Sequence, residues 1–114
     1  MRSIVEKKSF QFAIRIVNLY KHLTGEHGEY VMAKQVLRSG TSIGANVAES
    51  QQAQSRADFR AKLSIALKEE AETEFWLRLL HETDYLKDTE FSELYQDCRE
   101  LGKLLTAILK TLNE

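Results

Sequence analysis

The hydrophobic residues of this chain recur every three or four positions over four long stretches, a spacing that predicts amphipathic helices. The first stretch runs from about Ser3 to Leu23 and ends at a glycine-containing break, as helices commonly do. Its predicted core face consists of Phe10, Ala13, Ile14, Val17 and Tyr20, widened by Ile16, Leu19 and Leu23.

The second stretch, from about Glu29 to Gln52, has few bulky side chains on its hydrophobic face. This face consists of Ala33, Val36, Leu37, Gly40, Ile43, Gly44, Val47 and Ala48. A glycine inside a helix costs about 1 kcal/mol relative to alanine, so a compensating interaction is expected. Because Gly40 and Gly44 are four residues apart, we expect a neighbouring helix to approach closely there. A local kink is the alternative.

The third stretch has a start signal of its own, because Ser55 and Asp58 resemble a capping box that would begin a helix at Arg56. The predicted core face consists of Phe59, Leu63, Ala66, Thr73, Leu77 and Leu80, with Ile65 and Trp76 at its edge. Glu70 lies near the centre of this face, where an unpaired charge is costly to bury. We expect Glu70 either to meet a cation or, as the favoured interpretation, to lie in a wet part of the interface.

The fourth stretch has the most regular spacing in the chain, and Asp88 or Thr89 is the predicted cap. Its core face consists of Phe91, Leu94, Tyr95, Cys98, Leu101, Leu105, Ile108, Leu109 and Leu112. The alternation of three and four residues is typical of antiparallel bundles, and the chain contains no proline that would break a helix. The sequence therefore predicts an all-α protein: one domain over residues 1–114, folded as an antiparallel up-down-up-down four-helix bundle.

Charge nearly cancels over the whole chain, with 16 basic and 17 acidic residues, but the two halves differ. Residues 1–62 carry a net charge of +5 and residues 63–114 a net charge of −6. Lys7, Lys8, Arg15 and Lys21 form a candidate basic strip on the first helix for contacts with nucleic acid. Alternatively, acidic side chains of a neighbouring helix neutralise this strip, or it is merely solvated.

Signals of enzymatic chemistry are absent from the sequence. The three histidines lack the Glu-x-x-His pairs of di-metal bundles, Cys98 lies on a predicted core face, and there is no glycine-rich phosphate loop. We therefore expect no catalytic residue, metal, cofactor or small-molecule substrate, and no enzyme activity. No hydrophobic run approaches the roughly 20 residues that cross a bilayer, and a lone cysteine fits a reducing compartment, so a cytoplasmic protein without a membrane partner is expected.

The polar side of the second helix is the most specific feature of the sequence. It consists of Arg38, Ser39, Ser42, Asn46 and Glu49, spaced so that they follow one side of a helix. Arg38 and Glu49 are three turns apart, so each needs its own partner, from the third helix or from another subunit. A solvated polar face is the alternative.

Three motifs together resemble a known family. They are Arg38-Ser39 through Ala48-Glu49 with the pattern RSxxSIxxNxAE, then Asp58-Phe59, and Glu72-Thr73-x-x-Trp76-Leu77. The chain resembles the four-helix bundle family also called 23S rRNA intervening-sequence proteins, after the location of some of their genes. The resemblance implies ring-like homopentamers. It also groups Glu72, on the third predicted helix, with the polar face of the second helix as a candidate polar network or oligomer interface.

Related to this family is the accessory protein of diversity-generating retroelements, whose basic pentameric surface binds a reverse transcriptase and nucleic acid. The present chain, with a net charge of −1 and a pI of about 6.3, lacks that positive charge. The leading interpretation is thus a non-enzymatic homo-oligomeric scaffold. The alternative is an accessory protein that binds RNA, DNA or a ribonucleoprotein, together with a partner such as a reverse transcriptase.

Overall fold

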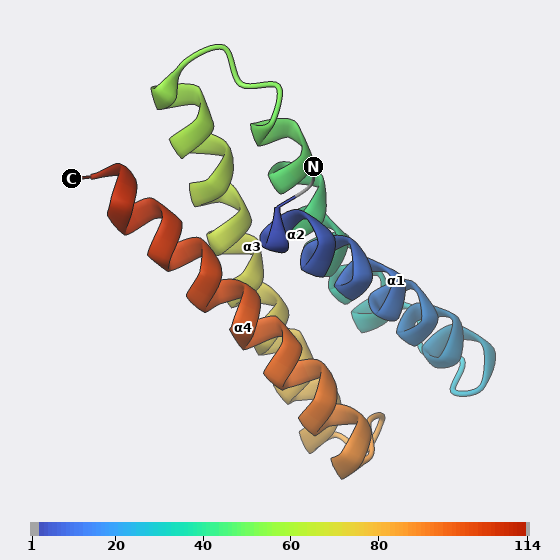
Figure 1. Ribbon diagram of the computed structural model, residues 1–114. Coiled ribbons are helices and arrows are strands. Elements are labelled where there is room, and N and C mark those ends of the chain that lie inside the picture. The colour runs from blue at the N-terminus through green and yellow to red at the C-terminus, as the bar shows by residue number, and fades with distance from the viewer. Residues whose placement is uncertain (1–2, 114) are drawn as a thin grey trace.

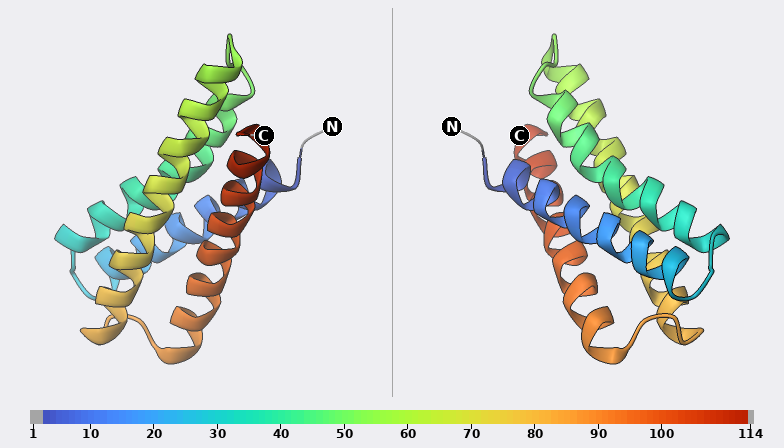
Figure 2. Two further views of the ribbon diagram at one scale, coloured as in Figure 1. Left: turned by 90° about the vertical axis from the view of Figure 1, so that its left-hand side faces the viewer. Right: turned by 90° about the vertical axis from the view of Figure 1, so that its right-hand side faces the viewer.

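The computed structural model describes residues 3–113, and this part of the chain forms four helices and no strand (Figure 1). The helices are α1 (Ile4–Gly25), α2 (Val31–Ser50), α3 (Arg56–Glu82) and α4 (Asp88–Leu112). Consecutive helices reverse direction across short turns (Figures 1 and 2). α1 and α3 each pack against α2 and α4 but not against each other, so they lie diagonally across the bundle. The predicted all-α four-helix bundle is confirmed.

Two of the helix starts follow the expected capping chemistry. The Ser3 side chain accepts a hydrogen bond from the Glu6 amide, and Glu6 Oε1 accepts one from the Ser3 amide at 3.0 Å. The predicted cap of α3 is also present, because Ser55 Oγ accepts from the Asp58 amide at 3.0 Å. Asp58 Oδ2 accepts from the Gln54 amide at 3.3 Å, so the reciprocal half of the capping box is shifted by one residue.

The predicted cap of α4 is wrong. Lys87 occupies the N-cap position without a side-chain hydrogen bond, and Asp88 is already the first helical residue. Asp88 Oδ1 instead lies 2.7 Å from Nε2 of His81, at the end of α3. This contact joins the two ends of the α3–α4 turn.

The core face of α1 is only partly the predicted one. Ile16, Leu19 and Leu23, which were predicted to widen the face, are buried together with Phe12, whereas much of the predicted central stripe lies at the surface. Phe10, Ile14 and Val17 are 62%, 48% and 37% exposed. Because α1 is hydrophobic on both of these sides, its periodicity alone could not show which side meets α2 and α4.

The glycines of α2 lie where α1 crosses closely, as predicted. A Cβ atom on Gly40 would lie 2.8 Å from Ile16 Cγ1, and one on Gly44 would lie 3.1 Å from the carbonyl oxygen of Ser9. Side chains at these positions would force the two helices apart, so the predicted close approach is confirmed. Ala48, which was predicted in the core, is exposed.

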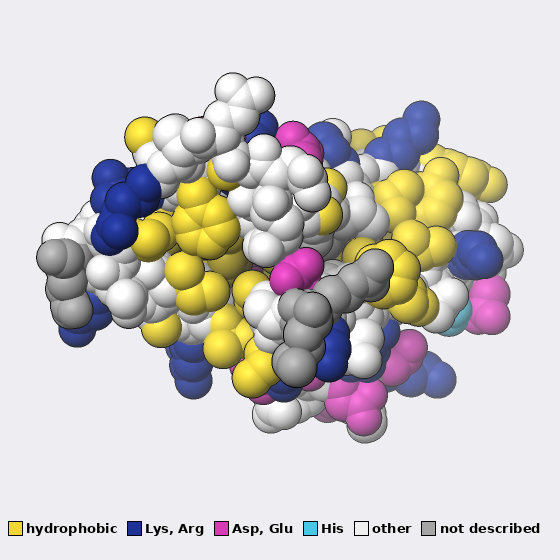
Figure 3. All heavy atoms as spheres, turned by 45° about the horizontal axis from the view of Figure 1, so that its top comes forward, with side chains coloured by type: hydrophobic (Ala, Val, Ile, Leu, Met, Phe, Trp, Pro, Cys, Tyr) yellow, Lys and Arg dark blue, Asp and Glu magenta, His cyan; other side chains and the backbone are white. Residues whose placement is uncertain are grey.

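The α2–α3 turn projects beyond the N-terminal end of α1 and the C-terminal end of α4 (Figure 2). Seen from this end, hydrophobic side chains are visible in two separate areas of the surface, one on the α1–α2 side and one on the α3–α4 side (Figure 3). Within residues 3–113, no helix combines the length and hydropathy needed to cross a membrane.

Candidate functional site

Arg38 connects the polar face of α2 to α3 within the same chain. Its guanidinium pairs with Glu72 and, at 3.0 Å, with Glu69 Oε2. Trp76 Nε1 also donates to Glu72 Oε2, at 2.9 Å. These hydrogen bonds, first from Trp76 and then from Arg38, lower the pKa of Glu72, and the Glu72 hydrogen bond in turn raises the pKa of Arg38. Of the two partners proposed for Arg38, the third helix is therefore the one that the structure provides.

The remaining residues of this face do not form one continuous network. Glu49 pairs with Lys62 of α3 at 3.2 Å, whereas the Asn46 amide donates to the Ser42 carbonyl of its own helix at 2.8 Å. Ser39 is fully buried, and its hydroxyl forms a 2.9 Å hydrogen bond with that of Thr73. Arg38, Ser39 and Glu49 thus join α2 to α3.

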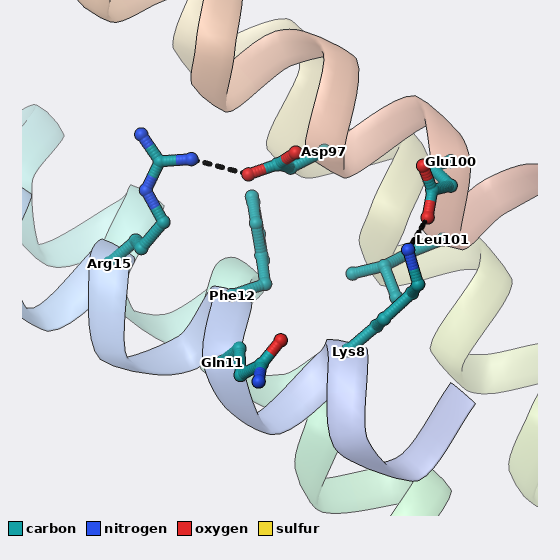
Figure 4. A pocket seen from close by; sticks show the side chains of 7 residues that line it. All are labelled: Lys8, Gln11, Phe12, Arg15, Asp97, Glu100 and Leu101. Carbon is teal, nitrogen blue, oxygen red and sulfur yellow. Dashed lines mark hydrogen bonds and ion pairs between the residues drawn. The ribbon is translucent and has the colours of Figure 1, made fainter. Parts of the chain in front are cut away.

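The basic strip predicted on α1 is partly neutralised by α4 (Figure 4). Lys8 pairs with Glu100, and Arg15 pairs with Asp97 and with Glu93, the latter at 3.3 Å. The neighbouring helix that neutralises these two side chains is α4. Two of the four predicted nucleic-acid contacts are therefore engaged in ion pairs that hold α1 against α4.

Several other cations have no carboxylate within 4.0 Å among residues 3–113. On α1 these are Lys7 and Lys21. On α4 they are Arg99, Lys103 and Lys110, which are exposed and share one side of the helix at intervals of four and seven residues. The structure thereby separates a positively charged side of α4 from the acidic side that faces α1.

Hydrophobic side chains that the core does not use form a stripe on the outer side of α1. Phe10, Ile14 and Val17 recur at intervals of four and three residues, and we call them the α1 stripe. Phe10 borders a surface hollow together with Ala48 of α2, so the apolar surface continues across the α1–α2 groove. On the diagonally opposite helix, α3, Ile65 and Phe75 are 43% and 54% exposed.

Glu70 is buried in the α3–α4 interface, with 4% of its surface exposed, so neither sequence-based expectation for it is met. Its carboxylate lies opposite Gly102 of α4, where a Cβ atom would come within 2.5 Å of Oε1. Cys98 Sγ donates a weak hydrogen bond to Glu70 Oε2 at 3.5 Å, and Tyr95 donates to Oε1 of the adjacent Glu74 at 3.2 Å. Burial, and after it the neighbouring Glu74 carboxylate, raise the pKa of Glu70 to about 8.

Cys98 has the environment of a structural thiol. It is fully buried, and burial together with the nearby Glu70 carboxylate raises the pKa of the thiol. A thiol becomes a nucleophile when its pKa is lowered, so the geometry does not favour a nucleophilic role for Cys98. Among the residues described, no group of three or more histidine, cysteine, aspartate or glutamate side chains could hold a metal ion.

The comparisons with known proteins place the chain in a family. The family model described as "23S rRNA-intervening sequence protein" matches residues 1–107. The chain belongs to this family. The resemblance derived from the RSxxSIxxNxAE motif is therefore confirmed, while the link to retroelement accessory proteins stays a prediction.

A solved structure is similar along almost the whole chain. It is the crystal structure of a protein of unknown function from the S23 ribosomal protein family of Bacteroides thetaiotaomicron VPI-5482. The two chains are 57% identical, the match covers 94% of this chain and 99% of the other, and the TM-score is 0.93. No curated protein matches the chain.

Two features of the surface and interior escaped the sequence analysis. The cations of α4 were not recognised because their half of the chain has a net negative charge. Their spacing of four and seven residues could have revealed them. The cluster around Glu70 could have been suspected from Gly102, a glycine on the inner side of a predicted helix. Only packing, however, places Gly102 opposite Glu70.

Proposed function

We propose that this member of the 23S rRNA-intervening sequence protein family is a non-enzymatic scaffold that assembles from copies of itself, as a ring of five. The observation that carries the proposal is the α1 stripe, in which three large hydrophobic side chains on one side of one helix remain at least 37% exposed. Contiguous exposed hydrophobic surface of this kind marks interaction sites in soluble proteins.

The positions of α1 and α3 favour a ring over a closed dimer. These helices lie diagonally in the bundle, and each carries exposed hydrophobic side chains. If the α1 stripe of one copy packs against Ile65 and Phe75 of the next copy, the contact is heterologous, and heterologous contacts generate rings when the rotation closes. Five copies is the number that the family resemblance implies.

The test is the mass of the assembly, measured by light scattering at micromolar concentration. We expect a mass several times that of one chain, and a value of five chains for the ring. Ile14→Glu should reduce the mass to that of a monomer while helicity by circular dichroism is retained, because Ile14 is not needed in the core. Ala107→Glu, which adds the same charge at an exposed position of α4, should leave the assembly intact. A monomeric wild-type protein would refute the proposal.

A second candidate function, binding to nucleic acid, is favoured by the positively charged side of α4. Each phosphate contact with lysine or arginine releases counterions, so binding of this kind weakens linearly with log salt concentration. On this proposal Arg99, Lys103 and Lys110 make more of the contacts than Lys8 and Arg15, which are already paired. RNA or DNA would then be the partner, alone or with a protein that processes it.

A matched pair of variants tests this candidate. One double variant, Lys103→Glu/Lys110→Glu, lies on α4, and the other, Lys7→Glu/Lys21→Glu, lies on α1. Both change the net charge by the same amount. Fluorescence anisotropy with a labelled single-stranded RNA should show a loss of affinity and a salt slope reduced by about two for the α4 pair only. Equal losses would indicate a general effect of charge, and no binding by the wild-type protein at low salt would exclude the function.

A further inference from the structure

The α3–α4 interface contains a carboxyl group in a place where a charge is unfavourable. Glu70 is 4% exposed, and its nearest neighbours include the backbone of Gly102, which leaves just enough space for the carboxylate. In this interface it has no cation within 4.0 Å among residues 3–113. Burial of an unpaired ionised carboxylate is costly, so the neutral form is favoured.

Glu74 follows Glu70 by one helical turn on α3 and is less buried than Glu70. Its carboxylate accepts a hydrogen bond from Tyr95 at 3.2 Å. The negative charge of Glu74 further disfavours the ionised form of Glu70. Glu70 is thus the group that carries the proton.

Other charged and titratable groups around Glu70 affect whether it carries the proton. From α4, Cys98 donates to Glu70, and the positive charge of Arg99 opposes the proton by favouring the ionised form. Lys103 lines a surface hollow together with Glu70 and Gly102. From α2, the other helix packed against α3, Arg38 pairs with Glu69 and Glu72 on a different side of α3.

We propose that Glu70 carries a proton while α3 and α4 are packed together, and that loss of this proton opens the two helices around Cys98. The α3–α4 pair is then a pH-responsive element of the fold. It needs no partner, and it acts whether or not the protein assembles. The direction of the pH dependence follows from linkage between proton binding and opening. When the two helices are packed together, Glu70 keeps its proton up to about pH 8, whereas in the opened interface it releases the proton near its ordinary pKa. Opening therefore becomes easier as the pH rises from about 5 to 8.

Cys98 allows opening to be measured directly, because it is the single cysteine of the chain and is buried at the proton site. The experiment is alkylation by iodoacetamide from pH 6 to pH 8, followed by mass spectrometry. Iodoacetamide reacts with the thiolate, so the growing thiolate fraction alone raises the alkylation rate about 10-fold per pH unit. Opening of the helices linked to loss of the Glu70 proton contributes up to another factor of about 10 per pH unit. We expect the wild-type rate to rise well over 10-fold per unit.

Glu70→Gln keeps the shape of the side chain but cannot ionise, so its rate should rise only about 10-fold per pH unit. Glu82→Gln, which removes an exposed carboxylate from the same helix, should behave as wild type. Equal pH dependence of Glu70→Gln and wild type would overturn the proposal.

If circular dichroism shows that Glu70→Gln does not fold, the wild-type protein decides the question. The side-chain carboxyl resonance of Glu70, followed by carbon NMR, should titrate with a midpoint above pH 6.5. A midpoint below that value would overturn the proposal.

Discussion

Gly40 is the residue at which the packing of α1 against α2 leaves the least space. Ile16 Cγ1 and Cγ2 would lie 2.8 and 2.9 Å from an added Cβ atom, and Ile16 itself is fully buried. Both atoms are attached directly to the Cβ atom of Ile16, so rotation of the end of the side chain does not remove the clash. The low helix propensity of glycine is therefore offset by the close approach of the two helices.

We predict that Gly40→Ala destabilises the protein by about 1–3 kcal/mol, because overpacking outweighs the gain in helix propensity. Urea unfolding followed by circular dichroism measures this change. Gly25→Ala is the matched control, because Gly25 is also in a helix. Apart from its chain neighbours and the backbone of its own helix, no atom lies within 4 Å of the added Cβ, so we expect a gain of up to about 1 kcal/mol. A neutral or stabilising effect at Gly40 would contradict the close packing.

Between elements, the bundle is joined by polar contacts on both flanks of its core. Arg38 of α2 pairs with two carboxylates of α3, and Lys8 and Arg15 of α1 pair with α4. These pairs are partly exposed, so each contributes about 0.2–1 kcal/mol.

The α2–α3 link predicts a response to acid. Because the pKa of Glu72 is lowered in the folded protein, the stability that it contributes is present above its ordinary pKa and is lost as the pH falls through the lowered value. We expect the wild-type protein to lose more stability than Glu72→Gln between pH 5 and pH 3, as measured by urea unfolding at each pH.

Trp76→Phe retains an aromatic ring, although a smaller one, and removes the donor that contributes most to lowering the pKa of Glu72. This variant should show an acid response between those of wild type and Glu72→Gln. Identical acid responses in all three proteins would mean that Glu72 gains nothing from Trp76 or Arg38 in the folded state.

For the whole molecule, assembly and stability are expected to be linked. Association of folded chains stabilises them by mass action, so the melting temperature of an oligomer rises with protein concentration. We predict such a rise for the wild-type protein and none for Ile14→Glu, measured by circular dichroism over a 100-fold range of about 1–100 μM. A wild-type melting temperature independent of concentration would indicate that the α1 stripe is not buried between copies.

The helices of this protein and its family could be recognised from the amino-acid sequence. Helical periodicity without proline, the Ser55 cap and the spacing of Gly40 and Gly44 each depend on residues within one helix or at its ends, so they could be recognised locally. The RSxxSIxxNxAE motif likewise identified the family that the comparison with residues 1–107 confirms.

Which surface of each helix is buried depends on how the helices pack against one another. α1 has two hydrophobic stripes, and the choice between Phe12 and Phe10 as a core residue depends on the helices that pack against it. The pairing of Arg15 with Asp97 and the position of Gly102 opposite Glu70 also join residues far apart in the chain. Local spacing contains no information about such pairs, because they are set by how the four helices pack together.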